Sequence, residues 1–165
     1  MSIESFFDFL FPPTLGEAEI RVLSGAETGR IVRVSFVLKT FKLVKENEFD
    51  VVSAPGLNGE PLTFVRGRAR TLTMVLHFDG RATNTDVRQP IREVTSLTNV
   101  DRDTQAPPVL SFEWTGFSFR CVLERSVVES FLSSFADGRP SRGRVRVALK
   151  ESRTLEDLLQ ESRRE

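Results

Sequence analysis

The residue types that carry most enzyme chemistry are scarce in this sequence. His77 is the only histidine, and Cys121 is the only cysteine. A Ser–His–Asp hydrolase would have to use His77 as its base, and no Gly-x-Ser-x-Gly turn is present to expose a nucleophile. A lone cysteine forms neither an intrachain disulfide nor a multi-cysteine metal site. The sequence therefore predicts a protein that is not an enzyme and that holds no cofactor or metal.

The surroundings of these two residues favour ordinary structural roles. His77 precedes Asp79 by two residues in a strand-like run, and the spacing matches no metal-binding loop. Cys121 alternates with Phe119 and Leu123, which is typical of a small side chain buried on one face of a strand. We expect a half-exposed histidine and a buried, unreactive thiol.

Arginine is the charged residue whose spacing stands out. Two sets alternate along the chain: Arg66, Arg68 and Arg70, and then Arg142, Arg144 and Arg146. In extended chain, period-two spacing places each set on one face. Such a stripe repels itself unless it faces water or meets carboxylates. The alternatives are a solvated face, a salt-bridged contact between subunits, or the lining of a charged pore.

A phenylalanine-rich segment opens the chain. Phe6, Phe7 and Leu10 lie near helical spacing within residues 3–11, and Pro12-Pro13 would end a helix there. Leaving these side chains in water would be costly. The segment therefore either covers the domain's own core or inserts into a neighbouring subunit or partner.

Length and charge narrow the class of protein. The 165 residues fit one domain, and 23 basic and 23 acidic residues give no net charge. A protein that binds nucleic acid through many phosphates normally shows a basic excess, so we expect no nucleic-acid partner. No window is long and apolar enough to span a membrane, and Glu4 and Asp8 argue against a targeting signal. We expect synthesis and assembly in the cytoplasm.

The elements that would position these residues are mostly strands. Alternating apolar residues predict a hairpin over 19–38 with its turn at 25–29, extended chain over 41–51, and strands over 62–64 and 71–78. The turn residues of 53–61 predict a loop. Helical spacing over 84–100 predicts one interior helix, with Pro90 in its first turn.

Three more strands are expected over 109–114, 117–128 and 143–150, before a C-terminal helix with a Thr154–Asp157 capping box. The sum is a mostly β, antiparallel barrel or sandwich of about seven strands, with one inserted helix and short terminal helices. We divide it into an N-terminal phenylalanine-rich segment (1–18), a tube-type β-barrel domain (19–151) and a helical tail (152–165).

Several segments, taken in order, resemble a known family. They are PGLNGEPLTFVRGRARTLTMVLHFDG, TDVRQPI, DTQAPPVLSFEWTGFSFRCVLE and FADGRPSRGRVRVALKESRTLED. Together they are similar to the tube-domain proteins of phage-tail-like contractile injection systems, above all to the adaptor between spike hub and tube. The resemblance runs from about Glu19 to Asp157. In that family the adaptor often continues into a LysM module, which does not follow Asp157 here, so we expect no role that depends on LysM.

The resemblance implies a tail-tube type barrel that assembles as a sixfold ring without catalysis. It implies a spike hub trimer below the ring, an inner tube or tube-initiator ring above it, and baseplate components around it, in a particle that is either released or anchored. We expect the subunit contacts at Phe6, Phe7 and Leu10 of the N-terminal segment and at the six arginines of the two sets above. We also expect them at Pro55, Gly56, Leu57, Phe64 and Gly67. The alternatives are the bulk inner-tube protein or a phage tail-tube protein and, in another class, a monomeric barrel that binds an apolar ligand.

Overall fold

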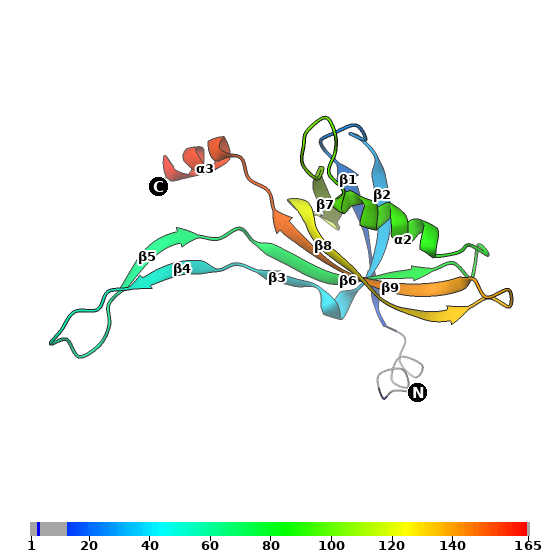
Figure 1. Cartoon of the computed structure of the whole chain (residues 1–165), viewed down its shortest axis with the longest axis horizontal. Coiled ribbons are helices and arrows are strands. Elements are labelled where there is room, and N and C mark those ends of the chain that lie inside the picture. The colour runs from blue at the N-terminus through cyan, green and yellow to red at the C-terminus, as the bar shows by residue number, and fades with distance from the viewer. Residues whose placement is uncertain (1–2, 4–12, 165) are drawn as a thin grey trace.

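The computed structural model describes residue 3 and residues 13–164, and it is built mainly from β-strands (Figure 1). The N-terminal helix expected over 3–11 lies outside the described residues apart from Ile3. The described residues contain nine strands: β1 (Leu15–Val22), β2 (Ile31–Val37), β3 (Lys42–Val44), β4 (Asn47–Val51), β5 (Leu62–Gly67), β6 (Thr71–Asp79), β7 (Val109–Trp114), β8 (Phe117–Ser134) and β9 (Pro140–Glu151).

Six of these strands close into a barrel. Neighbouring strands pair in the order β2-β1-β7-β8-β9-β6, and β6 returns to β2 through the pairs Ser35↔His77 and Phe36↔Leu76. Every pairing is antiparallel. The predicted mostly β, antiparallel fold class is therefore confirmed, and the barrel closes within one chain.

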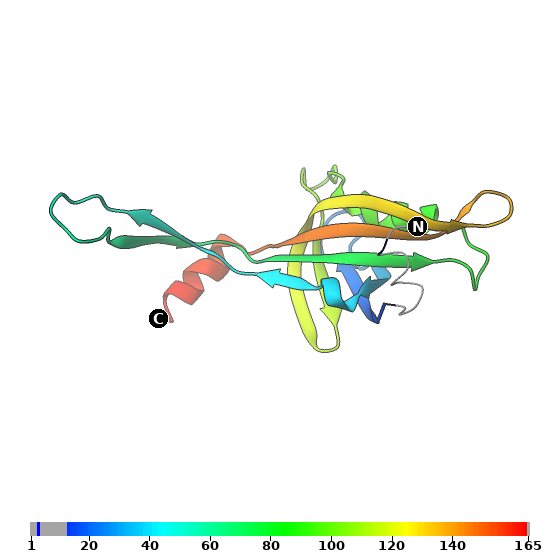
Figure 2. The same cartoon turned by 90° about the horizontal axis from the view of Figure 1, so that it is seen from below.

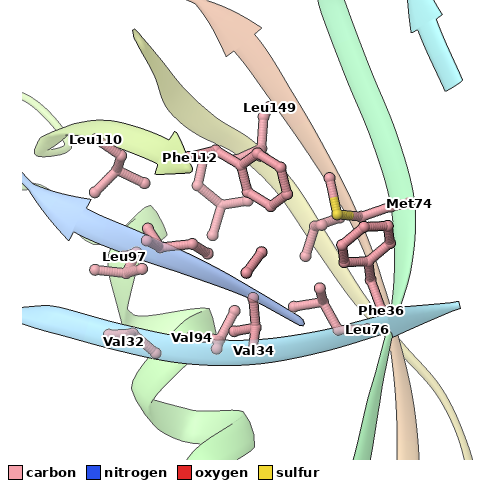
Figure 3. Close-up of a cluster of buried hydrophobic side chains, with 14 of the residues drawn as sticks. Val32, Val34, Phe36, Met74, Leu76, Val94, Leu97, Leu110, Phe112 and Leu149 are labelled. Atoms are coloured by element: carbon pink, nitrogen blue, oxygen red, sulfur yellow. The ribbon is translucent and has the colours of Figure 1, made fainter. Parts of the chain in front are cut away.

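The barrel is filled with apolar side chains that alternate along its strands. Figure 3 shows this core, in which aromatic and aliphatic residues from the strands meet residues of α2 (Arg88–Thr95) and of the 3-10 turn Ser96–Thr98. Val94 of α2 and Leu97 of that turn are fully buried there, as the helical spacing predicts. The core contains Phe36, Leu72, Met74, Leu76, Leu110, Phe112, Phe119 and Leu149.

Three of the barrel strands, β8, β9 and β6, also belong to a longer four-stranded layer, which β3 joins beside β6. β3 pairs with β6, β6 with β9, and β9 with β8. β8 extends to Ser134, six residues beyond the expected end at residue 128, because β9 starts at Pro140 and pairs with it over its whole length. A short 3-10 turn, Leu38–Thr40, leads from β2 into this layer.

Two elements project from the same end of the molecule. β4 and β5 form a two-stranded hairpin, hereafter the arm, that reaches away from the barrel (Figures 1 and 2). The helix α3 (Leu155–Ser162) also lies toward this end, and the turn between β8 and β9 lies at the opposite end. The capping box of α3 is present as predicted, with Thr154 and Asp157 exchanging hydrogen bonds.

Candidate assembly surfaces

The arm carries an apolar face that no described residue of the chain covers. Register pairs Phe49 with Phe64 and Val51 with Leu62, so these four side chains lie on one face. Leu62 is 65% exposed and Phe64 58% exposed. The two phenylalanine rings meet edge to face, with centroids 5.8 Å apart. A two-stranded hairpin alone is marginally stable in water, so this face favours a contact with another molecule.

The tip of the arm holds three of the predicted contact residues. Pro55, Gly56 and Leu57 lie in the loop between β4 and β5, and all are exposed. Gly56 has φ +90°, a left-handed conformation that glycine adopts without steric cost. The tip is therefore a turn with a defined backbone conformation, and it lies at the end of the arm that is farthest from the barrel (Figure 1).

The arginines at the base of the arm are held within the chain. Arg66 in β5 donates to Glu48 at 2.8 Å, and Arg68 lies 3.6 Å from the same carboxylate. Gly67 ends β5, so Arg68 and Arg70 lie in the break before β6 and the first set is not one continuous stripe. The carboxylate that meets Arg66 and Arg68 belongs to the arm itself.

Arg70 has a separate role. Its backbone N–H and its guanidinium both donate to Glu151, whose side chain is only 9% exposed, and its guanidinium stacks over Phe119. This clamp joins the base of the arm to Glu151, the residue that ends β9, four residues before α3 begins at Leu155. The clamp therefore fixes where both projecting elements leave the barrel.

The second arginine set forms the stripe that alternation predicts. Arg142, Arg144 and Arg146 lie on the outer face of β9, opposite Asp79, His77 and Val75 of β6. Arg142 donates to Ser133 and Arg146 donates to Glu129, both on β8. The stripe is therefore partly neutralised by its own sheet.

His77 lies half-buried on this outer face. Loss of solvent lowers its pKa below the usual 6.5, and the neighbouring Arg144 guanidinium lowers it further. A neutral imidazole in a cationic surrounding suits a structural position. Cys121 is fully buried, as predicted, and burial raises the pKa of its thiol to about 12. Within residues 13–164 no cluster of histidine, cysteine and carboxylate side chains could hold a metal ion.

The outer half of β8, here called the β8 edge (residues 124–134), has a free border that sequence reasoning missed, because it predicted the strand only to residue 128. β7 pairs with β8 only up to Val122, whereas β9 pairs with it to Ser134. Among the described strands, none pairs with the other side of the β8 edge. Its exposed apolar residues are Val127, Val128, Phe131 and Leu132. In the sequence, this surface is marked only by the apolar pairs Val127-Val128 and Phe131-Leu132 within a polar run. Bulges interrupt the alternation of apolar and polar residues there, so the pattern does not predict a strand.

Phe6, Phe7 and Leu10 lie outside the described residues, so the expected role of the N-terminal segment stays a prediction. No helix of the described part of the chain is both long and apolar enough to cross a membrane.

Two solved structures are similar to this chain to different degrees. The crystal structure of SPP1 Dit (gp 19.1), described as a paradigm of the hub adsorption apparatus of phages that infect Gram-positive bacteria, aligns with a TM-score of 0.50 and 14% identity. The alignment covers 82% of this chain but 49% of Dit, so the chain spans about half the length of that protein. The sheath–tube complex of the extracellular contractile injection system PVC aligns with a TM-score of 0.37 and 12% identity, over 93% of this chain and 96% of that one.

Comparison of sequences gives the family. No curated protein matches the sequence. A family model described as contractile injection system tube protein matches residues 21–160. Proteins of this family are structural components and not enzymes, which confirms the prediction of a non-catalytic role. A structural role takes the place of the alternative, a barrel that binds an apolar ligand. Because the match spans most of its length, this chain belongs to the contractile injection system tube proteins.

Proposed function

We propose that this chain forms a hexameric ring that joins the spike hub to the inner tube of a contractile injection system and templates the tube. The observation that carries the ring is a pair of unpaired strand borders on opposite sides of the four-stranded layer. One is the β8 edge; the other is the outer side of β3, which pairs only with β6 in the described chain.

Strand direction makes these two borders compatible. Directions alternate from β3 through β6 and β9 to β8, because each of the three pairings is antiparallel. A second copy in the same orientation therefore brings its β3 antiparallel to β8 of the first. Such a head-to-tail contact repeats around a ring and gives each of the two borders a partner strand when the ring closes. The sixfold number follows the family resemblance.

The shape of one copy also orients the ring. The barrel core lies on one side of the four-stranded layer, formed by the inward residues of β6 and β9. A closed cylinder of such layers has room for the barrels only on its outside. The arginine stripe on the opposite face, Arg142, Arg144 and Arg146, would then line the central hole. This reading favours the pore-lining role of that stripe.

The position between hub and tube rests on two supports. The sequence resembles the adaptor, and the barrel resembles the fold of a phage hub protein. The arm, with its exposed apolar face and shaped tip, gives the ring a contact that extends beyond its own barrel and fits the spike hub or a neighbouring ring. The bulk tube subunit is the second candidate, because the family model matches tube proteins in general.

Native mass spectrometry and negative-stain images of the purified chain test the ring, and quantitative proteomics of purified particles tests its position. We expect sixfold rings and one ring of six copies per particle. Dozens of copies per particle would make the chain the bulk tube protein. A stable monomer that is absent from particles would overturn the proposal.

A further inference from the structure

We propose that the N-terminal segment of one copy, residues 1–12, covers the apolar part of the β8 edge of the next copy in the ring. This inference rests on the proposed ring function and names a second partner for the same border. β3 of the neighbouring copy supplies a strand to the β8 edge, and the N-terminal segment supplies the cover that β3 is too short to give.

β3 is much shorter than the border that it meets. It has three residues, whereas the β8 edge runs from residue 124 to residue 134. Within one copy, Lys42 of β3 pairs with Thr73 of β6. Thr73 pairs with Ala148 of β9, and Ala148 pairs with Arg125 of β8. β3 is therefore level with the start of the β8 edge. Rotation about an axis along the strands keeps this level, so β3 of the next copy leaves the rest of the edge without a partner.

The part that β3 leaves uncovered is the apolar part. Val127 pairs with Arg146, whose side chain lies on the outer face of the layer. Val128 pairs with Val145, whose side chain lies in the core. Apolar side chains thus lie on both faces of this border, and they are 37% to 49% exposed: Val127, Val128, Phe131 and Leu132. Contact with another apolar surface would remove them from water.

The N-terminal segment leaves the barrel at the same level. The carbonyl of Thr14 accepts a hydrogen bond from the N–H of Leu38, the first residue of the 3-10 turn that precedes β3. Thr40 of that turn accepts a hydrogen bond from the N–H of Val75, and Val75 pairs with Arg146. The exit of the segment is therefore level with the apolar part of the β8 edge and lies on the β3 side of the layer. Figure 2 shows β3 (cyan) and β8 (yellow) at opposite borders of this layer, so in a head-to-tail ring the exit of one copy faces the β8 edge of the next.

The length and composition of the segment fit this surface. Extended chain of this length reaches at most about 40 Å. The uncovered part of the β8 edge spans about 30 Å at the usual rise of a strand. Residues 3–11 contain four phenylalanines, together with Ile3 and Leu10. Such a segment has enough apolar side chains to cover the border and loses free energy in water unless it is covered itself.

The β8 edge of the same copy is a poorer site for the segment. The barrel core fills the inner side of the layer between the two borders. A path over the outer face crosses the stripe of Arg142, Arg144 and Arg146, where phenylalanine side chains would remove guanidinium groups from water. The neighbouring copy offers the same apolar surface directly across the ring contact.

Cysteine pairs in the full chain test this exchange. The test variant is Leu10→Cys/Val128→Cys, and the control is Leu10→Cys/Ile31→Cys, because Val128 and Ile31 are 43% and 44% exposed. The native Cys121 is buried. With a flexible bismaleimide cross-linker we expect the test variant to give a ladder of covalent oligomers that ends at the hexamer, and the control to remain monomeric in denaturing gels.

A cross-link within single copies of the test variant, or equal yields in test and control, would overturn the exchange. Native mass spectra of the same samples report the ring separately. Intact hexamers without the ladder would remove the role of the N-terminal segment and leave the ring. Covalent dimers from samples that never form hexamers would instead remove the ring and leave the exchange.

Serine substitutions measure how much the segment contributes. Because burial of one phenylalanine corresponds to about tenfold or more in a binding constant, Phe6→Ser/Phe7→Ser should raise the concentration needed for rings by at least about tenfold. The melting temperature of the dilute monomer should not change. The control Ser2→Ala/Ser5→Ala keeps every apolar side chain of the segment and should assemble normally. A lowered melting temperature of the dilute Phe6→Ser/Phe7→Ser monomer would show that the segment covers its own domain.

Discussion

Replacing the two arm phenylalanines with serine, as Phe49→Ser/Phe64→Ser, separates folding of the subunit from its assembly. Both side chains lie on the arm, away from the core, and are at least half exposed. Exposed positions usually change stability by no more than about 0.5 kcal/mol. Loss of their edge-to-face pair adds about 0.5–1.5 kcal/mol, confined to the arm. The barrel should therefore keep its melting temperature.

Assembly should respond far more strongly. Full burial of one phenylalanine is worth about 1.5–3 kcal/mol, and each of these rings is already about half buried, so losing both removes about 1.5–3 kcal/mol from each arm contact. Since about 1.4 kcal/mol is tenfold in a binding constant, each contact weakens by about 10- to 10²-fold. The control Ile31→Ser changes a side chain of similar exposure, 44%, on β2 rather than on the arm.

Calorimetry measures folding, and native mass spectrometry across a dilution series measures assembly onto rings or the spike hub. We expect an unchanged unfolding transition and loss of assembly for the arm variant only. Assembly of the variant at the same concentration as the unaltered chain would refute an intermolecular role of the arm. A lowered melting temperature of the whole barrel would show instead that the arm packs on its own domain.

Three further changes have defined outcomes. The pKa of His77 is lowered in the fold, so the unfolded chain binds a proton first as pH falls below 6.5, and native stability should fall in that interval. In urea unfolding, the free energy of unfolding of the unaltered chain should fall as the pH is lowered below 6.5, and this pH dependence should be absent from the His77→Gln variant. Gly80→Ala places a methyl group against the carbonyl oxygen of Thr85, within a turn closed by a hydrogen bond between these two residues, and should cost about 1–3 kcal/mol in thermal unfolding. An unchanged melting temperature would contradict that turn geometry. Arg66→Glu sets a second carboxylate opposite Glu48 and should impair ring assembly, seen by light scattering, while far-ultraviolet circular dichroism stays unchanged. Normal rings from this variant would argue against a role of the arm base in assembly.

The local elements of this protein could be read from its residues. Strict alternation in Leu72, Met74 and Leu76 predicted a strand with one buried face, and the structure buries all three. The spacing of Ile91, Val94 and Leu97 predicted the buried side of the interior helix in the same way. Such patterns depend only on the period of the backbone, which is a local property.

Which surfaces remain for assembly was decided by pairing between distant segments. No local pattern could show that β2 returns to β6 and closes the barrel, or that β8 outlasts β7 and leaves the β8 edge unpaired. The bulges of β8 shift its side chains from face to face, which removes the alternation that a reader of the sequence would seek. Likewise, Arg70 does not lie in one stripe with Arg66 and Arg68. It binds the nearly buried carboxylate of Glu151, which is distant in the sequence. The sequence by itself determined the strands, the helices and the family, whereas the three-dimensional pairing decided which strand borders remain without a partner. The physical reason is that each strand can form backbone hydrogen bonds with one neighbour on each side, and the register fixes where that neighbour ends.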